Sequence, residues 1–142
     1  MTTSRASAVW EGKLKDGKGS YKAASGTFSG AYSFRTRFEG APGSTPEELL
    51  AAAHAACYSM ALSHGLDGAG TPATRVATEA ACTIDKVGDG FKITTMELKV
   101  RGKVPGIDQA KFQQAAEAAK NGCPVSGALK GNVQIKLDAK LE

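Results

Sequence analysis

The first forty residues alternate between short apolar stretches and glycine-centred turns, a pattern that indicates strands rather than helices. Glycines at positions 12, 17, 19 and 26 separate these stretches. Residues 31–38 alternate in part, with Tyr32, Phe34 and Phe38 at one parity. Period-two alternation places apolar side chains on one face of a strand, so this segment is predicted to be a strand with Arg37 at its end.

A nearly continuous apolar stretch at residues 49–62 predicts a long central helix. Thr45 can cap its start, Pro46 suits the first helical position, and Glu48 completes a Thr-x-x-Glu capping box. We expect the helix to end at Gly65. Because it is apolar nearly all round, we expect it to be buried on all sides. The apolar stretch at residues 49–62 is shorter than the ~20 apolar residues that a membrane span requires.

The second half of the chain predicts a hairpin, a helix and a last strand. Alternating residues 76–84 and 91–100 flank a Gly-Asp-Gly turn, and a phase change indicates a bulge near Thr94 and Thr95. The later elements are a helix at 109–121 capped by Asp108, a short segment at 123–129 and an alternating strand at 133–141. This order predicts an α+β fold with antiparallel sheets, and the length fits one domain over residues 1–142.

The composition points to a small core and argues against several kinds of partner. Apolar residues make up 42% of the chain but aromatic residues only 6%, so a monomer would have a thin core. Sharing apolar surface with a second copy would solve this. The net charge of +4 comes from scattered basic residues, which does not indicate a nucleic-acid-binding arm. No secretory signal follows Met1, so we expect a cytoplasmic protein.

Three cysteines in such a chain do not form a disulfide scaffold, which leaves core packing, metal binding or redox chemistry. Cys82 lies mid-strand among apolar neighbours and is expected to be a core residue. Cys57 lies within the apolar helix. Cys123 follows a helix-ending glycine and precedes Pro124 at a new helix start, where free N–H groups and the helix dipole lower a thiol pKa.

The other polar residues near the central helix leave several interpretations open. A zinc site of Cys57, Cys123 and His54 would lack a fourth ligand, so we expect no metal. His54 and His64 are expected to pack as helix residues. Glu47 suits the first turn of a helix, and Arg37 could be a surface residue, so neither indicates a site without further information.

Five ordered segments together resemble one known family. They are Trp-Glu-Gly at 10–12, Arg-Phe-Glu-Gly at 37–40, Pro-Glu-Glu-Leu at 46–49, the stretch from Ala53 to Leu62 around Cys57, and Gly-Cys-Pro-Val-Ser at 122–126. This set resembles the OsmC/Ohr family of thiol peroxidases, in particular its osmotically inducible protein C branch. The likeness runs from about Trp10 to the C-terminus, and the two cysteine motifs together make it specific.

The resemblance implies an intertwined α+β homodimer with active sites between the chains. It implies the reduction of organic hydroperoxides to alcohols without a bound cofactor. Cys57 matches the peroxidatic position, Cys123 the resolving position, Arg37 the active-site arginine and Glu47 its carboxylate partner. A dithiol such as a dihydrolipoyl group is the implied reductant.

The residue types give this chemistry a physical basis. An apolar helix raises the pKa of the Cys57 thiol, so a cation is needed to form the thiolate. Arg37 is permanently charged, and Glu47 can hold its planar fork by two hydrogen bonds. Ten helical residues from Glu47 to Cys57 span about 15 Å, so we expect Arg37 and Glu47 to approach Cys57 of the partner chain.

The neighbours of these residues suggest a substrate class, and two other functions remain open. Apolar side chains favour alkyl or lipid hydroperoxides over hydrogen peroxide; they are Phe38, Leu49, Leu50, Tyr58 and Met60. A cysteine hydrolase would need Cys57 activated by His54 or His64, and would leave Cys123 without a role. A ligand-binding, stress-protective dimer would hold a lipid in an apolar pocket and make no use of the cysteines.

Overall fold

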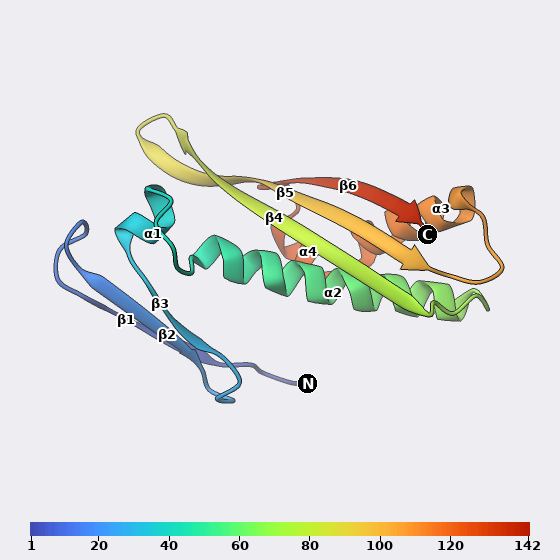
Figure 1. Cartoon of the computed structure of the whole chain (residues 1–142), viewed down its shortest axis with the longest axis horizontal. Coiled ribbons are helices and arrows are strands. Elements are labelled where there is room, and N and C mark those ends of the chain that lie inside the picture. Colours follow the sequence, from blue (N-terminus) through green and yellow to red (C-terminus); the bar gives the residue numbers. More distant parts are fainter. The chain divides into compact units, whose positions relative to one another are not determined.

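The computed structural model describes all 142 residues, and the chain forms two compact units, Met1–Leu49 and Leu50–Glu142 (Figure 1). Each unit carries a three-stranded sheet, and the fold is α+β as predicted. The boundary between the units falls within the long helix α2. In chain order the elements are β1 (Ala6–Glu11), β2 (Lys18–Ala23), β3 (Ser29–Tyr32), α1 (Phe34–Phe38), α2 (Pro46–Gly68), β4 (Arg75–Val87), β5 (Gly90–Lys103), α3 (Gln109–Gly122), α4 (Pro124–Leu129) and β6 (Gln134–Leu141).

The first unit is an antiparallel sheet with the strand order β1-β2-β3. Aromatic rings pack across one face, where the centroids of Trp10 and Tyr32 lie 5.6 Å apart. Gly19 of β2 pairs with both residues in register. A Cβ atom at Gly19 would lie 2.8 Å from the Trp10 ring, so the glycine gives the two rings room to meet.

The predicted strand over residues 31–38 is wrong beyond Tyr32. The chain turns there into α1, because Ser33 and Thr36 form a reciprocal capping box. The Ser33 hydroxyl accepts from the Thr36 N–H at 3.1 Å, and the Thr36 hydroxyl oxygen accepts from the Ser33 N–H at 3.0 Å. Two satisfied backbone donors favour a helical start over continued alternation. Arg37 therefore lies on a helical turn rather than at a strand end.

The second unit contains the predicted hairpin, but its sheet is mixed. β4 and β5 pair antiparallel, with the register shift at Thr83 and Ile84 leaving Thr94 as the extra residue, which confirms the predicted bulge. β5 and β6 pair in parallel. The prediction of antiparallel sheets is therefore wrong for the last strand. In the chain order α3 and α4 follow β5 and precede β6. They return the chain to the end of the sheet where β5 begins, as a parallel pair of strands requires.

The core of the second unit lies on one face of this sheet. Met96, Leu98 and Val100 of β5 are at most 1% exposed, whereas Glu97 and Lys99 between them face solvent. These apolar side chains join one cluster with residues of α2 and α3. The alternation along β5 thus defines a helix-covered face and an open face.

Helix α2 begins as predicted, since the Thr45 hydroxyl accepts from the Glu48 N–H at 3.0 Å. It continues past Gly65 and ends at Gly68, before Gly70 with a φ of +78°. Within the single chain only one face is buried, so the expected burial on all sides is not found. The opposite face is open, and Met60 on it is 76% exposed. No helix of the chain is both long and apolar enough to span a membrane.

Candidate active site

Two cysteines from different elements meet in the second unit. Cys57 lies in the middle of α2, and Cys123 joins α3 to α4. Their Sγ atoms are 3.0 Å apart and hydrogen-bonded, and neither cysteine is in a disulfide. Either sulfur can donate to the other, because a thiol is both a weak donor and a weak acceptor. Cys57 is half-buried and Cys123 is 1% exposed, so solvent reaches the pair through Cys57.

The surroundings of Cys123 favour its thiolate. Burial raises the pKa of this thiol, but the hydrogen bonds with Cys57 and with Val125 and Ser126 lower it by more. Cys123 is the N-cap residue of α4. Its sulfur makes no formal capping hydrogen bond, yet the polar hydrogens of the first turn lie around it. The direction of this shift agrees with the lowered thiol pKa expected at this helix start, although the hydrogen bond with Cys57 contributes more than any single N–H group of the helix.

The surroundings of Cys57 have the opposite effect. Burial raises the pKa of the Cys57 thiol, and the hydrogen bond and charge of Cys123 raise it further. Only the Val125 N–H lowers it. Two thiols at this separation titrate as a pair, and within this unit the first negative charge belongs mainly to Cys123. The expectation that Cys57 needs an added cation to become a thiolate therefore has a structural basis.

Arg37 and Glu47 form the predicted ion pair within the first unit. Arg37 Nη2 donates to Glu47 Oε1 at 2.8 Å, and Nε donates to the two carboxylate oxygens at 3.0 and 3.3 Å. The Glu47 side chain is 6% exposed and that of Arg37 is 34% exposed. Glu47 also stands in the first turn of α2, where the helix dipole favours a carboxylate.

The geometry of this ion pair leaves some N–H donors of Arg37 unused by Glu47. Glu47 engages the side of the guanidinium that carries Nε and Nη2. A guanidinium has five N–H donors, so the two on Nη1 remain for a further acceptor. The guanidinium carbon lies 5.3 Å from the centroid of the Phe38 ring, which flanks the charge. Glu47 thus fixes the orientation of the Arg37 guanidinium, whose Nη1 donors can bind a further acceptor.

The four predicted site residues come together as two pairs, Arg37 with Glu47 and Cys57 with Cys123. Cys82 is half-buried and packs against the core, as expected of a structural cysteine. No three His, Cys, Asp or Glu side chains gather into a group that could hold a metal ion.

The structure adds Ser126, which the sequence analysis did not single out. Its hydroxyl lies 2.7 Å from Nε2 of His54, and both residues are buried. His54 therefore packs as expected, whereas His64 is exposed, contrary to expectation. Neither histidine hydrogen-bonds Cys57, so the activating base of a cysteine hydrolase is not formed. The spacing of three residues between Cys123 and Ser126, at the start of a predicted helix, was the one sequence feature that could have indicated that Ser126 lies near the cysteine.

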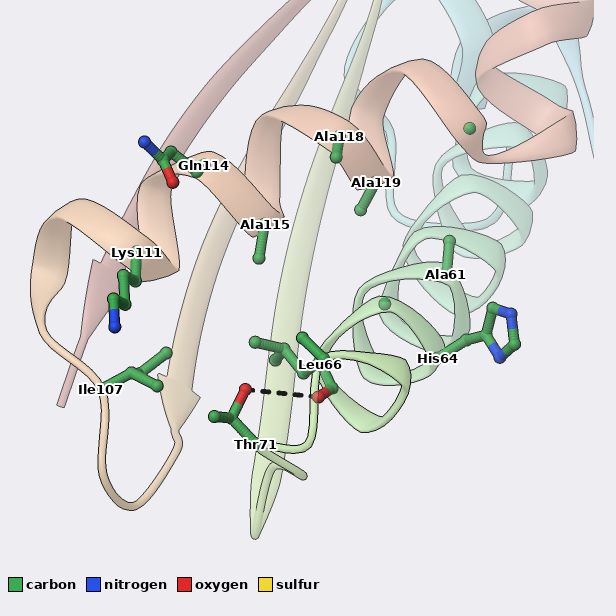
Figure 2. Close-up of a pocket in the computed structure, with 13 residues that line it drawn as sticks. Ala61, His64, Leu66, Thr71, Ile107, Lys111, Gln114, Ala115, Ala118 and Ala119 are labelled. Atoms are coloured by element: carbon green, nitrogen blue, oxygen red, sulfur yellow. Dashed lines mark hydrogen bonds between the residues drawn. The ribbon is translucent and has the colours of Figure 1, made fainter.

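A separate apolar hollow of about 640 Å³ lies between the C-terminal half of α2 and α3 (Figure 2). Figure 2 shows alanines of α3 facing Ala61 and Leu66 of α2. His64 and Lys111 lie among the polar lining residues, and Thr71 bonds the Leu66 carbonyl at 3.3 Å. Neither cysteine of the thiol pair lines this hollow.

Comparison with known proteins gives matches over most of the chain. The family model described as OsmC-like protein matches residues 38–138. Peroxiredoxin OsmC of Escherichia coli (strain K12) is 49% identical over 136 residues, which cover 95% of this chain and 94% of that protein. Organic hydroperoxide resistance protein OhrB of Bacillus subtilis (strain 168) is 36% identical over 103 residues, covering 72% of this chain and 74% of OhrB.

Solved structures match over nearly the whole chain. The crystal structure of B. subtilis OhrB has a TM-score of 0.76 at 29% identity, covering 96% of this chain and 98% of that one. An organic hydroperoxide resistance protein OsmC from Legionella pneumophila has a TM-score of 0.79 at 24% identity, covering 99% and 98% of the two chains, and supports the fold alone. The motifs, the extent of the family match and the shared fold agree, and the chain belongs to the OsmC-like family.

Proposed function

We propose that this protein is a thiol peroxidase that reduces organic hydroperoxides to alcohols. The observation that carries the proposal is the 3.0 Å separation of the Cys57 and Cys123 sulfur atoms. Two thiols at this distance can form a disulfide with a small movement of the side chains. The relatives named peroxiredoxin and organic hydroperoxide resistance protein support the same chemistry.

The cycle uses one cysteine for attack and the other for resolution. The Cys57 thiolate attacks a peroxide oxygen, the O–O bond breaks, and the alkoxide takes a proton and leaves as alcohol. The Cys57 sulfenic acid then reacts with the Cys123 thiolate, forming the disulfide and releasing hydroxide, which is protonated to water. A dithiol, such as one of lipoyl type, exchanges with the disulfide, restoring both thiols and becoming a disulfide itself. Exposure supports this order, because peroxide can reach half-buried Cys57 more easily than Cys123.

Arg37 supplies the cation that the Cys57 thiolate requires, and Glu47 holds it in place. The Nη1 donors that Glu47 leaves unused can bind the thiolate and the peroxide oxygen. We propose that the whole chain works as one OsmC-like domain within an intertwined homodimer, and that Arg37 and Glu47 serve Cys57 of the partner chain. The open face of α2 supports a dimer, because the middle part of this face is apolar; the exposed apolar residues there are Ala52, Ala53, Ala56 and Met60.

An apolar approach to Cys57 would favour alkyl and lipid hydroperoxides. Met60, one turn from Cys57, is exposed and available to line such an approach. Tyr58 is fully buried, with its hydroxyl donating to the Ala116 carbonyl, so it belongs to the core instead. The proposal predicts a higher kcat/KM with cumene hydroperoxide than with hydrogen peroxide. Equal efficiency with the two substrates would contradict the proposed preference.

A thiol count tests the cycle directly. Fully reduced protein is treated with one equivalent of cumene hydroperoxide, and free thiols are counted after denaturation. We expect the count to fall from three to one, with a Cys57–Cys123 link in the peptide map. An unchanged count with peroxide still present would refute the proposed function. The Cys82→Ser variant is the matched control, since it should fall from two thiols to none.

Mixed dimers test the assignment of Arg37 to the partner chain. Arg37→Ala chains and Cys57→Ser chains are each expected to be inactive. If the two residues act across the interface, a mixed dimer contains one intact site and regains about half of the activity of one wild-type dimer. Verified mixed dimers without activity would show that Arg37 serves the Cys57 of its own chain.

The second candidate function is binding of an apolar ligand without chemistry, which the hollow between α2 and α3 favours (Figure 2). Its test is the variant with both Cys57 and Cys123 changed to Ser. Retained binding of a fatty-acid probe, together with undiminished protection against peroxide, would favour this function over the peroxidase.

A further inference from the structure

A histidine–serine pair lies next to the resolving cysteine and has no role in the cycle described so far. His54 Nε2 and Ser126 Oγ are 2.7 Å apart. His54 is fully buried and Ser126 is 3% exposed. A buried polar atom without a hydrogen bond costs free energy, and Nδ1 of His54 is such an atom, so apolar residues would fill this volume at lower cost. The pair therefore calls for a chemical explanation.

The unpaired nitrogen of His54 decides which way this hydrogen bond runs. Nδ1 is buried and has no hydrogen-bond partner. Burial lowers the pKa of His54, so the ring is neutral and carries one proton. A proton on Nδ1 would leave a buried N–H without an acceptor, which folded proteins rarely tolerate. The proton therefore belongs on Nε2, which donates to Ser126 Oγ.

A hydroxyl that accepts from His54 keeps its own hydrogen for another acceptor. Cys123 is the N-cap of α4 and Ser126 is the third residue of that helix, so their side chains lie on one face of the same turn. The hydrogen bond of the Ser126 side chain lowers the pKa of the Cys123 thiol, as a donor to the sulfur should. Because His54 Nε2 donates to Ser126 Oγ, the Ser126 hydroxyl is free to donate in turn to the sulfur of Cys123.

We infer that His54 orients the Ser126 hydroxyl as a donor to Cys123 Sγ, and that this donor stabilises Cys123 as a thiolate. The inference rests on the proposed peroxidase cycle and assigns two further residues to it. In this inference Ser126 acts as a catalytic residue, because its hydroxyl donates to the reacting sulfur, and His54 is a positioning residue that acts through Ser126.

This donor acts at two steps of the cycle. In disulfide formation it keeps the Cys123 thiolate available to attack the sulfenic sulfur of Cys57. In reduction, an incoming dithiol reaches half-buried Cys57 rather than Cys123, which is 1% exposed. The thiolate of the dithiol then forms a mixed disulfide with Cys57, and the S–S bond breaks with its electron pair on Cys123. A leaving thiolate stabilised by Ser126 departs faster.

The test separates the first step of the cycle from the second. In Ser126→Ala, sulfenic acid formation at Cys57 should not slow, because weaker stabilisation of the Cys123 thiolate leaves more of the charge to Cys57. Disulfide closure should slow by roughly 3- to 10-fold, because loss of one hydrogen bond to a charged group lowers the thiolate fraction by about 10- to 100-fold and the more basic thiolate is in turn more nucleophilic. Excess peroxide should then convert more Cys57 sulfenic acid to sulfinic acid. Rapid mixing with a sulfenic-acid probe, followed by mass spectrometry, measures both steps.

Three further variants distinguish chemistry from loss of structure. His54→Gln keeps an amide donor near the Nε2 position and should retain most of the closure rate, whereas His54→Leu should lose it. The His54→Leu/Ser126→Ala double variant leaves neither partner unpaired in the core, and should fold while closing slowly. Ser59 lies on the same helix as Cys57, and its hydroxyl is hydrogen-bonded to Thr78 of β4. The Ser59→Ala variant is the control and should leave both steps unchanged.

Normal closure in folded Ser126→Ala or in the double variant would refute the inference and leave the peroxidase intact. Equal slowing of both steps would also refute it, because that result indicates general damage to the site. Wild-type protein that forms no disulfide at all would instead refute the proposed function.

Discussion

Removing Arg37 should destabilise the protein more than removing Glu47, although both changes break the same ion pair. Arg37→Met leaves the Glu47 carboxylate, whose side chain is 6% exposed, without its three N–H···O contacts. Glu47→Gln leaves Arg37, which is 34% exposed and can be hydrated, and the new amide oxygen still accepts one hydrogen bond. The asymmetry follows from the unequal burial of the two partners.

The size of each effect follows from that burial. An uncompensated buried charge costs about 3–5 kcal/mol, and the dipole of α2 offsets about 1 kcal/mol of this for Glu47. We therefore expect Arg37→Met to lower the free energy of unfolding by about 2–4 kcal/mol. Glu47→Gln should lower it by about 1 kcal/mol, the ordinary contribution of a hydrogen bond.

Urea unfolding followed by circular dichroism measures both values, at one fixed protein concentration because assembly adds to apparent stability. Arg35→Met is the matched control on the same helical turn. Its ion pair with Glu39 spans 3.5 Å between side chains that are 73% and 53% exposed, so no measurable change is expected. Equal losses in Arg37→Met and Glu47→Gln, or a larger loss in Glu47→Gln, would refute the argument from burial.

Three other changes have defined outcomes. Gly102→Ala would bring a Cβ atom within 2.6 Å of the Phe112 ring and should lower the free energy of unfolding by about 1–3 kcal/mol, whereas Gly90→Ala meets no atom and should cost less than 1 kcal/mol by urea unfolding. Tyr58→Phe removes the buried hydrogen bond to the Ala116 carbonyl and should cost about 1 kcal/mol in the same assay. Cys123→Ser removes the neighbouring charge and hydrogen bond that raise the pKa of Cys57, so that pKa should fall and alkylation of Cys57 should begin at lower pH; an unchanged or higher pH midpoint would contradict the coupling of the two thiols.

The parts of the fold with strong local signals could be predicted from the sequence. The cap at Thr45, the Asp108 cap of α3 and the bulge opposite Thr83 each depend on a few neighbouring residues. The segment after Tyr32 was mispredicted because alternation and a capping box compete there, and the box satisfies two backbone groups. The direction of β6 depends on how two helices return the chain, which no local pattern records.

The candidate site divides in the same way. The two thiols and the Arg37–Glu47 pair could be proposed because their motifs resemble those of the OsmC/Ohr family, whereas the residue types alone left Arg37 and Glu47 open. The hydrogen bond from His54 to Ser126 joins residues 72 positions apart, so no local sequence pattern indicates that they meet. Serine and histidine are also common at the edge of a protein core. Only the unpaired Nδ1 of His54 in the structure indicates the direction of its hydrogen bond with Ser126.

Access and proton affinity point to different cysteines in this protein, and the geometry explains how both can hold. Cys57 is the more accessible of the two thiols and takes the peroxide in the proposed cycle, yet the surroundings within the second unit favour the thiolate of Cys123. The sulfur atoms are 3.0 Å apart, so a proton can pass between them without movement of either helix. In the proposed cycle, Arg37 therefore has to shift the negative charge of a thiol pair from Cys123 to Cys57, which its Nη1 donors favour, rather than lower the pKa of an isolated Cys57 thiol. Once Cys57 is oxidised that competition ends, and the same Ser126 hydroxyl that opposed the shift favours the thiolate that closes the disulfide.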